Sequence, residues 1–150
     1  MTAIDRLRDE VTRSDGRLAP LRVLAASGQL GYGIPEAALA TGVARKPHLI
    51  GCDMGSIDPG PYYLGSGQLA TSEAMTRADL RKVLRAARSA GVPLLLGTAG
   101  TAGAKPHLEA TLAMVREIAA EEGLHFRLAS IRADMPRDEV KRAIGTGRVK

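Results

Sequence analysis

Apolar residues follow two alternating patterns along the chain, short continuous runs and longer helical stripes. The runs at 21–26, 48–53 and 92–97 are rich in Leu, Ile, Val and Ala, a composition typical of buried strands. The segment 124–131 instead alternates apolar and polar residues, which predicts a fourth strand with one wetter side. Between the runs, apolar residues three and four positions apart predict helices that end at glycine or proline.

The helical stripes and the strand-like runs alternate in a regular order. Thr76 is expected to cap the helix that follows the second run, with Asp79 in the place of the capping-box acid. Alternating strands and helices imply a parallel sheet with right-handed crossovers. We therefore predict a single α/β domain over 1–150, a three-layer Rossmann-like parallel sheet of about four strands with flanking helices. The helices are expected at about 4–13, 35–42, 76–91, 106–122 and 137–144.

Composition places the chain among globular proteins of one domain. It has 150 residues, of which 45% are hydrophobic and 25% charged, so it is long enough to bury a core. The formal net charge is +5, which reflects either an arginine-rich composition or an anionic ligand, and acidic residues are interspersed throughout. Only 3% of residues are aromatic, so a stacking platform for single strands is absent and we expect no nucleic-acid partner.

Targeting features are missing from the sequence. The single cysteine, Cys52, excludes an internal disulfide and fits a reducing compartment. The amino-terminal residues contain no apolar segment of the kind found in a signal peptide. No apolar run approaches the ~20 residues that a membrane span needs. We expect a soluble cytoplasmic protein without a membrane partner.

Polar or glycine-rich residues follow every expected strand. Ligands of open α/β sheets bind outside the carboxyl ends of the strands, so these exits should form one shared site. Each exit contributes candidates for binding a substrate or an anion. They are Ser27 and Gly28 after the first run, Ser56 after the second, Thr98, Gly100, Thr101, Lys105 and His107 after the third, and Asp134 after the fourth.

Three residues of the second exit are candidates for catalysis. Asp53 or Asp58 could act as a general base, and Tyr62 could donate to a developing oxyanion. Two close carboxylates could also hold a divalent ion, and the residues leave both metal and cofactor unknown. In the simpler interpretation, Asp53 caps a turn and Asp58-Pro-Gly is only a β-turn.

The two glycine-rich loops each have two interpretations. The segment 98–105 has backbone donors, hydroxyls and a lysine that suit a phosphate or carboxylate, but it could be only a flexible turn. The segment 27–33 resembles a dinucleotide turn without its glycine order, or serves as a tight strand-to-helix turn. Cys52 is interpreted as a packed, inert thiol, and His48 and His125 as structural residues. The arginines of 77–88 form either a solvated helix face or a contact with a partner.

Several segments together resemble a known family. The most specific is Gly51-Cys-Asp-Met-Gly-Ser-Ile-Asp-Pro-Gly-Pro-Tyr-Tyr-Leu-Gly-Ser-Gly67, supported by 26–36, 97–103 and 124–128. Over about 21–144 the chain resembles the N-terminal portion of the acyclic terpene utilisation AtuA-like family. Members are usually much longer than 150 residues. The resemblance implies bacterial catabolism of branched or acyclic carboxylic acids or their CoA thioesters.

Two classes of function are compatible with these features. The first is an enzyme, or the ligand-binding half of one, that acts on a small carboxylate or CoA ester by lyase-like or hydro-lyase chemistry. The second is a non-catalytic nucleotide- or CoA-binding module, or a structural subunit of a larger assembly. Since four strands make a small sheet, we expect either a homo-oligomer or a C-terminal partner chain.

Overall fold

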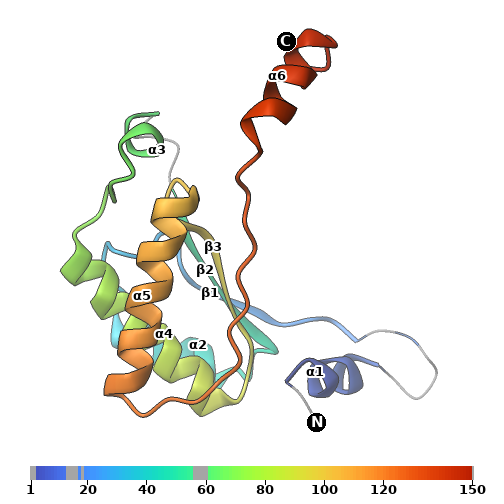
Figure 1. The fold of residues 1–150 in the computed structure, drawn as a ribbon. Coiled ribbons are helices and arrows are strands. Elements are labelled where there is room, and N and C mark those ends of the chain that lie inside the picture. The colour runs from blue at the N-terminus through green and yellow to red at the C-terminus, as the bar shows by residue number, and fades with distance from the viewer. Residues whose placement is uncertain (1–2, 13–16, 18, 56–60, 150) are drawn as a thin grey trace.

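The computed structural model describes residues 3–12, 17, 19–55 and 61–149. A parallel sheet and a layer of helices make up its body (Figure 1). The strands are β1 (Val23–Ser27), β2 (Leu49–Gly55) and β3 (Leu94–Thr101); the helices are α1 (Ala3–Val11), α2 (Glu36–Ala44), α3 (Tyr62–Ser66), α4 (Glu73–Ala90), α5 (Lys105–Glu121) and α6 (Arg137–Gly145).

The described sheet has the order β1-β2-β3, with both pairs of strands parallel. In the register, Ile50 of β2 lies between Leu24 of β1 and Leu94 of β3. Irregular pairing follows Ala25 on β1 and Asp53 on β2, near the carboxyl ends of these strands. The α/β class and the parallel sheet are confirmed, with three strands in place of about four.

The core lies between the sheet and α2, α4 and α5, which all pack on one face. Because each strand lies beside the previous one in a constant direction, crossovers of one hand return over the same face. Alternate residues of β2 are therefore buried against the helices. The core residues are Ile50, Cys52 and Met54 from β2, Leu39 from α2, Leu80, Val83, Leu84 and Ala87 from α4, and Met114, Val115 and Ile118 from α5.

The opposite face of the sheet is open. Val23 on β1 and Leu95 on β3 point to this side and are 54% and 59% exposed. Gly51 pairs with both Ala25 and Leu95 in the same row. Parallel sheets are normally covered on both faces. The described residues thus form two layers, sheet and helices, and the expected third layer is not formed by them.

The predicted fourth strand is wrong. Residues 124–136 are extended but pair with no strand in the described structure. Leu124 and Phe126 pack against the core, as the alternation predicts, whereas Leu128 is exposed and Ile131 is 92% exposed. Alternation identified the buried side chains but could not supply a neighbouring strand. The segment leads instead to α6, which stands away from the sheet (Figure 1).

Two helix boundaries differ from expectation for local reasons. Helix α4 begins at Glu73 after an N-cap at Ser72, so Thr76 lies inside the helix and not at its cap. Helix α2 continues through Gly42, where a Cβ atom would lie 2.5 Å from Leu24 Cδ1, so the missing side chain lets helix and strand approach. In the described part of the chain, no helix is long and apolar enough to cross a membrane.

The arginines of α4 bind α5. Arg77 pairs with Glu117 at 2.6 Å, and Arg81 and Arg85 pair with Glu122 at 3.1 and 3.3 Å. Glu121 accepts hydrogen bonds from both Arg77 and Arg81. This row of charges is therefore an ion-pair network between two neighbouring helices. Its members remain partly exposed to solvent, with Arg85 64% exposed, and three of the four arginines of the stripe have their ion-pair partners within the chain.

Candidate functional site

The carboxyl ends of the three strands are held together by contacts outside the regular ladder. The Leu30 N–H donates to the Asp53 backbone oxygen at 2.8 Å, which joins the turn after β1 to the end of β2. A Cβ atom on Gly55 would lie 2.2 Å from Thr98 Cγ2, so the end of β2 is in tight contact with β3. The predicted convergence of the exits is thus present for these three strands.

A buried carboxylate holds the glycine-rich turn after β1. Asp79 on α4 is 1% exposed and accepts hydrogen bonds from the N–H groups of Gly31, Gly33 and Ile34 at 3.0, 2.9 and 2.9 Å. Lys82, one helical turn along, donates to the Ile34 carbonyl at 2.8 Å. The turn is therefore fastened to α4 at several points, and Asp79 has this role in place of a capping-box role.

The Asp79 contacts decide between the two interpretations of this turn. In a dinucleotide turn, backbone N–H groups and a helix N-terminus receive the phosphates. Here Asp79 occupies the N–H groups of Gly31, Gly33 and Ile34. The segment 27–33 is therefore a tight turn satisfied from within, which disfavours a pyrophosphate at this position. One feature of the sequence indicates that Asp79 is buried. It directly precedes Leu80, which lies on the apolar face of α4.

Asp53 lies at the carboxyl end of β2, where the pairing becomes irregular. Its Oδ1 accepts from the Gly55 N–H at 2.8 Å, so the carboxylate does stabilise the next turn. The side chain is exposed, and its Oδ2 has no hydrogen-bond partner among the described residues. One oxygen thus orients the carboxylate, and the other is free to act on a ligand.

Two polar side chains at the carboxyl end of β1 and in the turn after it are buried without partners in the described structure. The Ser27 Oγ and Gln29 Nε2 atoms are inaccessible to solvent and make no hydrogen bond in the described structure. Ser27 pairs in register with Cys52, directly before Asp53, and Gln29 precedes Leu30, whose N–H contacts the Asp53 carbonyl. Buried groups of this kind normally have a partner, so the pair needs an explanation. Ser27 was predicted to be in the site, whereas Gln29 was not singled out.

Two predicted site residues, one at the end of β3 and one in α5, have structural roles. The Thr101 Oγ1 accepts from the Ala70 N–H at 3.0 Å, and His107 Nε2 lies 3.1 Å from the Gln68 carbonyl. Both side chains are buried and anchor the segment that leads into α4. His107 Nδ1 is buried and has no partner in the described part of the chain. Thr101 and His107 therefore hold one wall of the exit region.

The carboxyl-terminal half of β3 has an unusual backbone. Thr98, Gly100 and Thr101 all have positive φ, at 47°, 65° and 84°. Glycine is required at position 100 for two reasons. Its φ is positive, and a Cβ atom there would lie 2.8 Å from the His107 Cβ and carbonyl oxygen. Positive φ is costly for threonine, and such conformations cluster at functional sites. Thr98 is exposed at this position, next to Gly55.

The anion position at the start of α5 is occupied by the chain itself. Asp134 Oδ1 accepts from the Lys105 N–H at 3.0 Å, at the positive end of the helix dipole. The Lys105 ammonium lies 3.6 Å from Glu109, one turn along α5. The Lys105 N–H and the Asp134 carboxylate thus bind each other, and neither residue has a hydrogen bond or ion pair with Asp53 in the described part of the chain. A ligand anion at this position would have to displace Asp134.

Cys52 is buried and lies on the core side of β2. Burial raises the pKa of its thiol to about 11, with a smaller contribution from Asp79, while a hydrogen bond with the Ala26 backbone lowers it. A thiol with this pKa is protonated near neutral pH and is a poor nucleophile. The interpretation of Cys52 as an inert core residue therefore agrees with its environment.

Of the remaining predicted residues, Tyr62 and Gly28 are described by the structure and Asp58 and Ser56 are not. Tyr62 is 62% exposed on α3 and meets Tyr63 edge-on, with ring centroids 5.1 Å apart. Gly28 has no atom within 4 Å of the position a Cβ would take, so its backbone is approachable. Asp58 and Ser56 lie outside the described residues. Over the described ranges, no group of three His, Cys, Asp or Glu side chains could hold a metal ion.

Comparisons with known proteins add no further assignment: no family model, no curated protein and no solved structure matches the chain.

Proposed function

We propose that the protein binds a small carboxylate, or its CoA ester, at the carboxyl edge of the sheet. In this proposal it is the ligand-binding half of an enzyme in the catabolism of branched or acyclic carboxylic acids. The observation that carries the proposal is the presence, at one end of the sheet, of two buried, unpartnered groups, Ser27 Oγ and Gln29 Nε2, and of the exposed, unbonded Oδ2 of Asp53. A hydroxyl and an amide N–H both suit a carboxylate or carbonyl oxygen.

Asp53 is the proposed general base of a lyase-like reaction. Its Oδ2 would remove a proton from the carbon next to the ligand carbonyl, a leaving group would depart from the neighbouring carbon, and a C=C bond would form. Tyr62 and Asp58 remain candidates for the donor to the oxyanion and for a second acid. The resemblance to the AtuA-like family supports this substrate class.

The open face of the sheet supports the idea of a half-enzyme. Val23 and Leu95 are more than half exposed on a surface that parallel sheets normally cover. A second polypeptide or a second copy lying on this face would also border Asp53, which shares the row of Gly97 at the end of the sheet. The proposed ligand would then bind between the carboxyl edge of the sheet and this second polypeptide or copy.

Ligand-induced thermal shifts test the proposal. Succinate, citrate, isovalerate, acetyl-CoA and ATP would be compared at matched ionic strength. Stabilisation by a carboxylate or the CoA ester supports the proposal, since a ligand that binds only the folded state raises its stability. Stabilisation by ATP alone supports a nucleotide-binding module. No shift with any ligand supports a structural subunit.

Asp53→Asn identifies the site of any shift. Its amide oxygen can still accept from the Gly55 N–H, so the turn is kept while the charge is lost. We expect ligand affinity to fall about tenfold or more, the range for a hydrogen bond to a charged group. Asp138→Asn on α6 is the control, because it removes the same charge from an exposed position away from the sheet. Equal affinity in both variants would contradict a role for Asp53.

A further inference from the structure

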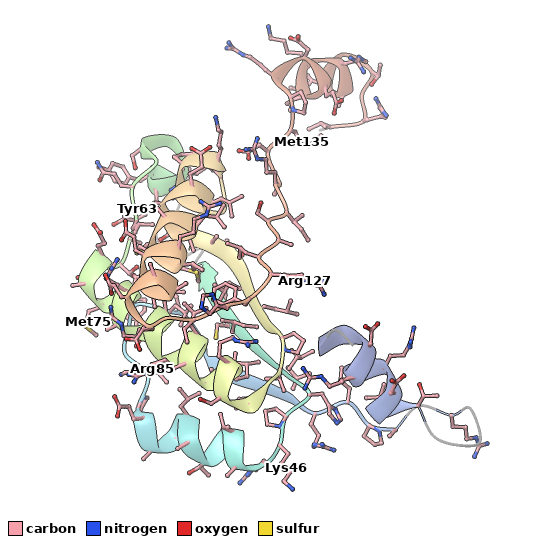
Figure 2. The ribbon with its side chains drawn as sticks, turned by 60° about the horizontal axis from the view of Figure 1, so that its bottom comes forward. Lys46, Tyr63, Met75, Arg85, Arg127 and Met135 are labelled. Atoms are coloured by element: carbon pink, nitrogen blue, oxygen red, sulfur yellow. The ribbon has the colours of Figure 1, made fainter. Side chains whose placement is uncertain are left out.

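A hollow lies at the end of the sheet opposite Asp53, among the amino ends of the strands. It has a volume of about 520 Å³ and lies between α1, the residues before β1 and the connections into β2 and β3. This volume is within the usual range for small-molecule sites. Figure 2 shows Lys46, one of its lining residues, at the far end of the body from Tyr63 on α3. The hollow is therefore separate from the Asp53 region.

Among the described residues, cations line this hollow without acids. Arg6, Arg22 and Lys46 are among its lining residues, and no aspartate or glutamate of the described ranges is. The Arg6 side chain, the terminal nitrogens of Arg22 and the Lys46 ammonium have no ion-pair partner in the described ranges. The arginines on α4 behave differently, since Arg77, Arg81 and Arg85 are all paired with glutamates of α5.

Two of the cations are held in fixed relation to each other. The Arg22 Nε–H donates to the Lys46 carbonyl at 2.8 Å, and the Arg22 backbone N–H donates to His48 Nδ1 at 3.0 Å. His48 is buried, so β1 and the start of β2 are fastened together here. Orientation through Nε leaves the outer edge of the guanidinium, the side that matches an oxyanion, directed away from this bond.

The backbone at Lys46 adds a second observation. Lys46 follows α2 with φ of 52°, a left-handed conformation that favours glycine or asparagine at the end of a helix. A lysine there costs stability, and strained residues of this kind cluster at functional sites. The strain is explained if the ammonium is needed in the hollow.

Local helix dipoles oppose an anion but do not outweigh the cations. Helices α2 and α4 both end near the hollow, and each carboxyl end carries about half a negative charge. Their last carbonyls are already bonded, for example by the Gly91 and Lys46 N–H groups. Three full positive charges against about one negative charge leave the hollow positive.

We propose that this hollow binds the phosphate group of a small phosphorylated molecule. Arginine and lysine together recognise phosphate by paired hydrogen bonds and by charge. Apart from His48, whose Nδ1 accepts from the Arg22 N–H, the other lining residues are small or aliphatic, as Val43, Val92 and Pro93 are, and suit a small organic body. The site is an effector or second-substrate position at the edge of the sheet opposite Asp53.

The test measures binding of inorganic pyrophosphate to the full chain by isothermal titration calorimetry. The wild type is compared with Arg6→Gln, Lys46→Gly and, as a control for charge, Lys141→Gln on α6. We expect each of the first two variants to bind about tenfold more weakly and the control to match the wild type. Equal binding by all four proteins, or absence of binding by the wild type, overturns the proposal.

Lys46→Gly separates binding from folding. Glycine relieves the left-handed strain, so Tm should rise by about 2–4 °C while pyrophosphate binding falls. A loss of both stability and binding would mean that the lysine has only a structural role and would overturn the assignment. Asp53→Asn should leave pyrophosphate binding unchanged, because that residue is at the other end of the strands. Binding of a 20-nucleotide single strand would be measured in the same way. If the strand binds more tightly than pyrophosphate, the hollow is a nucleic-acid site and the proposal is overturned.

Discussion

Replacement of Asp79 tests how the carboxyl edge is built. Its carboxylate is the common acceptor for the N–H groups of Gly31, Gly33 and Ile34. In Asp79→Ala these donors lose their acceptor inside the structure. Water can reach the bond to Gly33, which is only partly buried, but not the bonds to Gly31 and Ile34.

The cost follows from the two buried donors. Each unsatisfied buried N–H group costs about 1–3 kcal/mol, so Asp79→Ala should lower the free energy of unfolding by about 2–6 kcal/mol. This is a large part of the ~5–15 kcal/mol by which domains are stable. Asp79→Asn can keep one oxygen on Gly31 and Gly33 but turns its amide N–H₂ toward Ile34. It should therefore cost about 1–3 kcal/mol, the penalty for one lost donor.

Urea denaturation followed by circular dichroism measures these differences, and amide exchange measured by NMR locates them. Asp79→Asn should speed exchange at Gly31, Gly33 and Ile34 more than at the core strand β2. Asp138→Asn on exposed α6 is the matched control, with an expected change within ~0.5 kcal/mol. The reasoning is refuted if Asp79→Asn is as stable as that control, because Asp79 would then not hold the turn.

Two further predictions concern β2. Gly55→Ala should destabilise the protein by about 1–3 kcal/mol, because the new Cβ would lie 2.2 Å from Thr98 Cγ2, whereas Gly51→Ala on the same strand meets no atom within 4 Å; similar urea midpoints for both would contradict the packing. The raised pKa of Cys52, about 11 against 9.0, means that an unfolded thiol ionises first, so stability should fall as pH rises from about 9 to about 11. Cys52→Ala should remove this part of the pH dependence, and native Cys52 should resist iodoacetamide at pH 8.

The apolar spacing predicts the main helices and strands because the same side chains that make the pattern also make the core. Leu80, Val83, Leu84 and Ala87 form the expected buried face of α4, and the three apolar runs are β1, β2 and β3. Strand order is also constrained, since short parallel connections favour neighbouring strands. These features depend on local pattern and chain connectivity alone.

Features that depend on long-range pairing were beyond the sequence. The alternation of 124–131 does not say whether a neighbouring strand exists, and the described structure offers none. Charged residues on α4 could not be assigned to solvent or to a partner until α5 was seen to carry Glu117, Glu121 and Glu122 beside them.

The candidate site stays a prediction, and the structure shows only where its proposed members lie and what they contact. Asp53 and Ser27 both lie at the carboxyl edge, where Ser27 pairs with Cys52, because parallel strands end together. Thr101, His107, Lys105 and Asp134 lie near the exits but bond to the chain itself. Whether a polar residue faces a ligand or a backbone group depends on tertiary contacts, and a motif does not encode them. Asp79 illustrates the same limit, since its acceptor role appears only in the folded chain.

The most direct test of the central claim is the carboxylate dependence of stability in the wild type and in Asp53→Asn. We predict that a carboxylate or CoA-ester ligand raises Tm in the wild type and in Asp138→Asn. The same ligand should give a much smaller shift in Asp53→Asn, whose unliganded Tm should match the wild type because the bond to Gly55 is kept. Equal ligand shifts in Asp53→Asn and the wild type would contradict a ligand site at the carboxyl edge of the sheet.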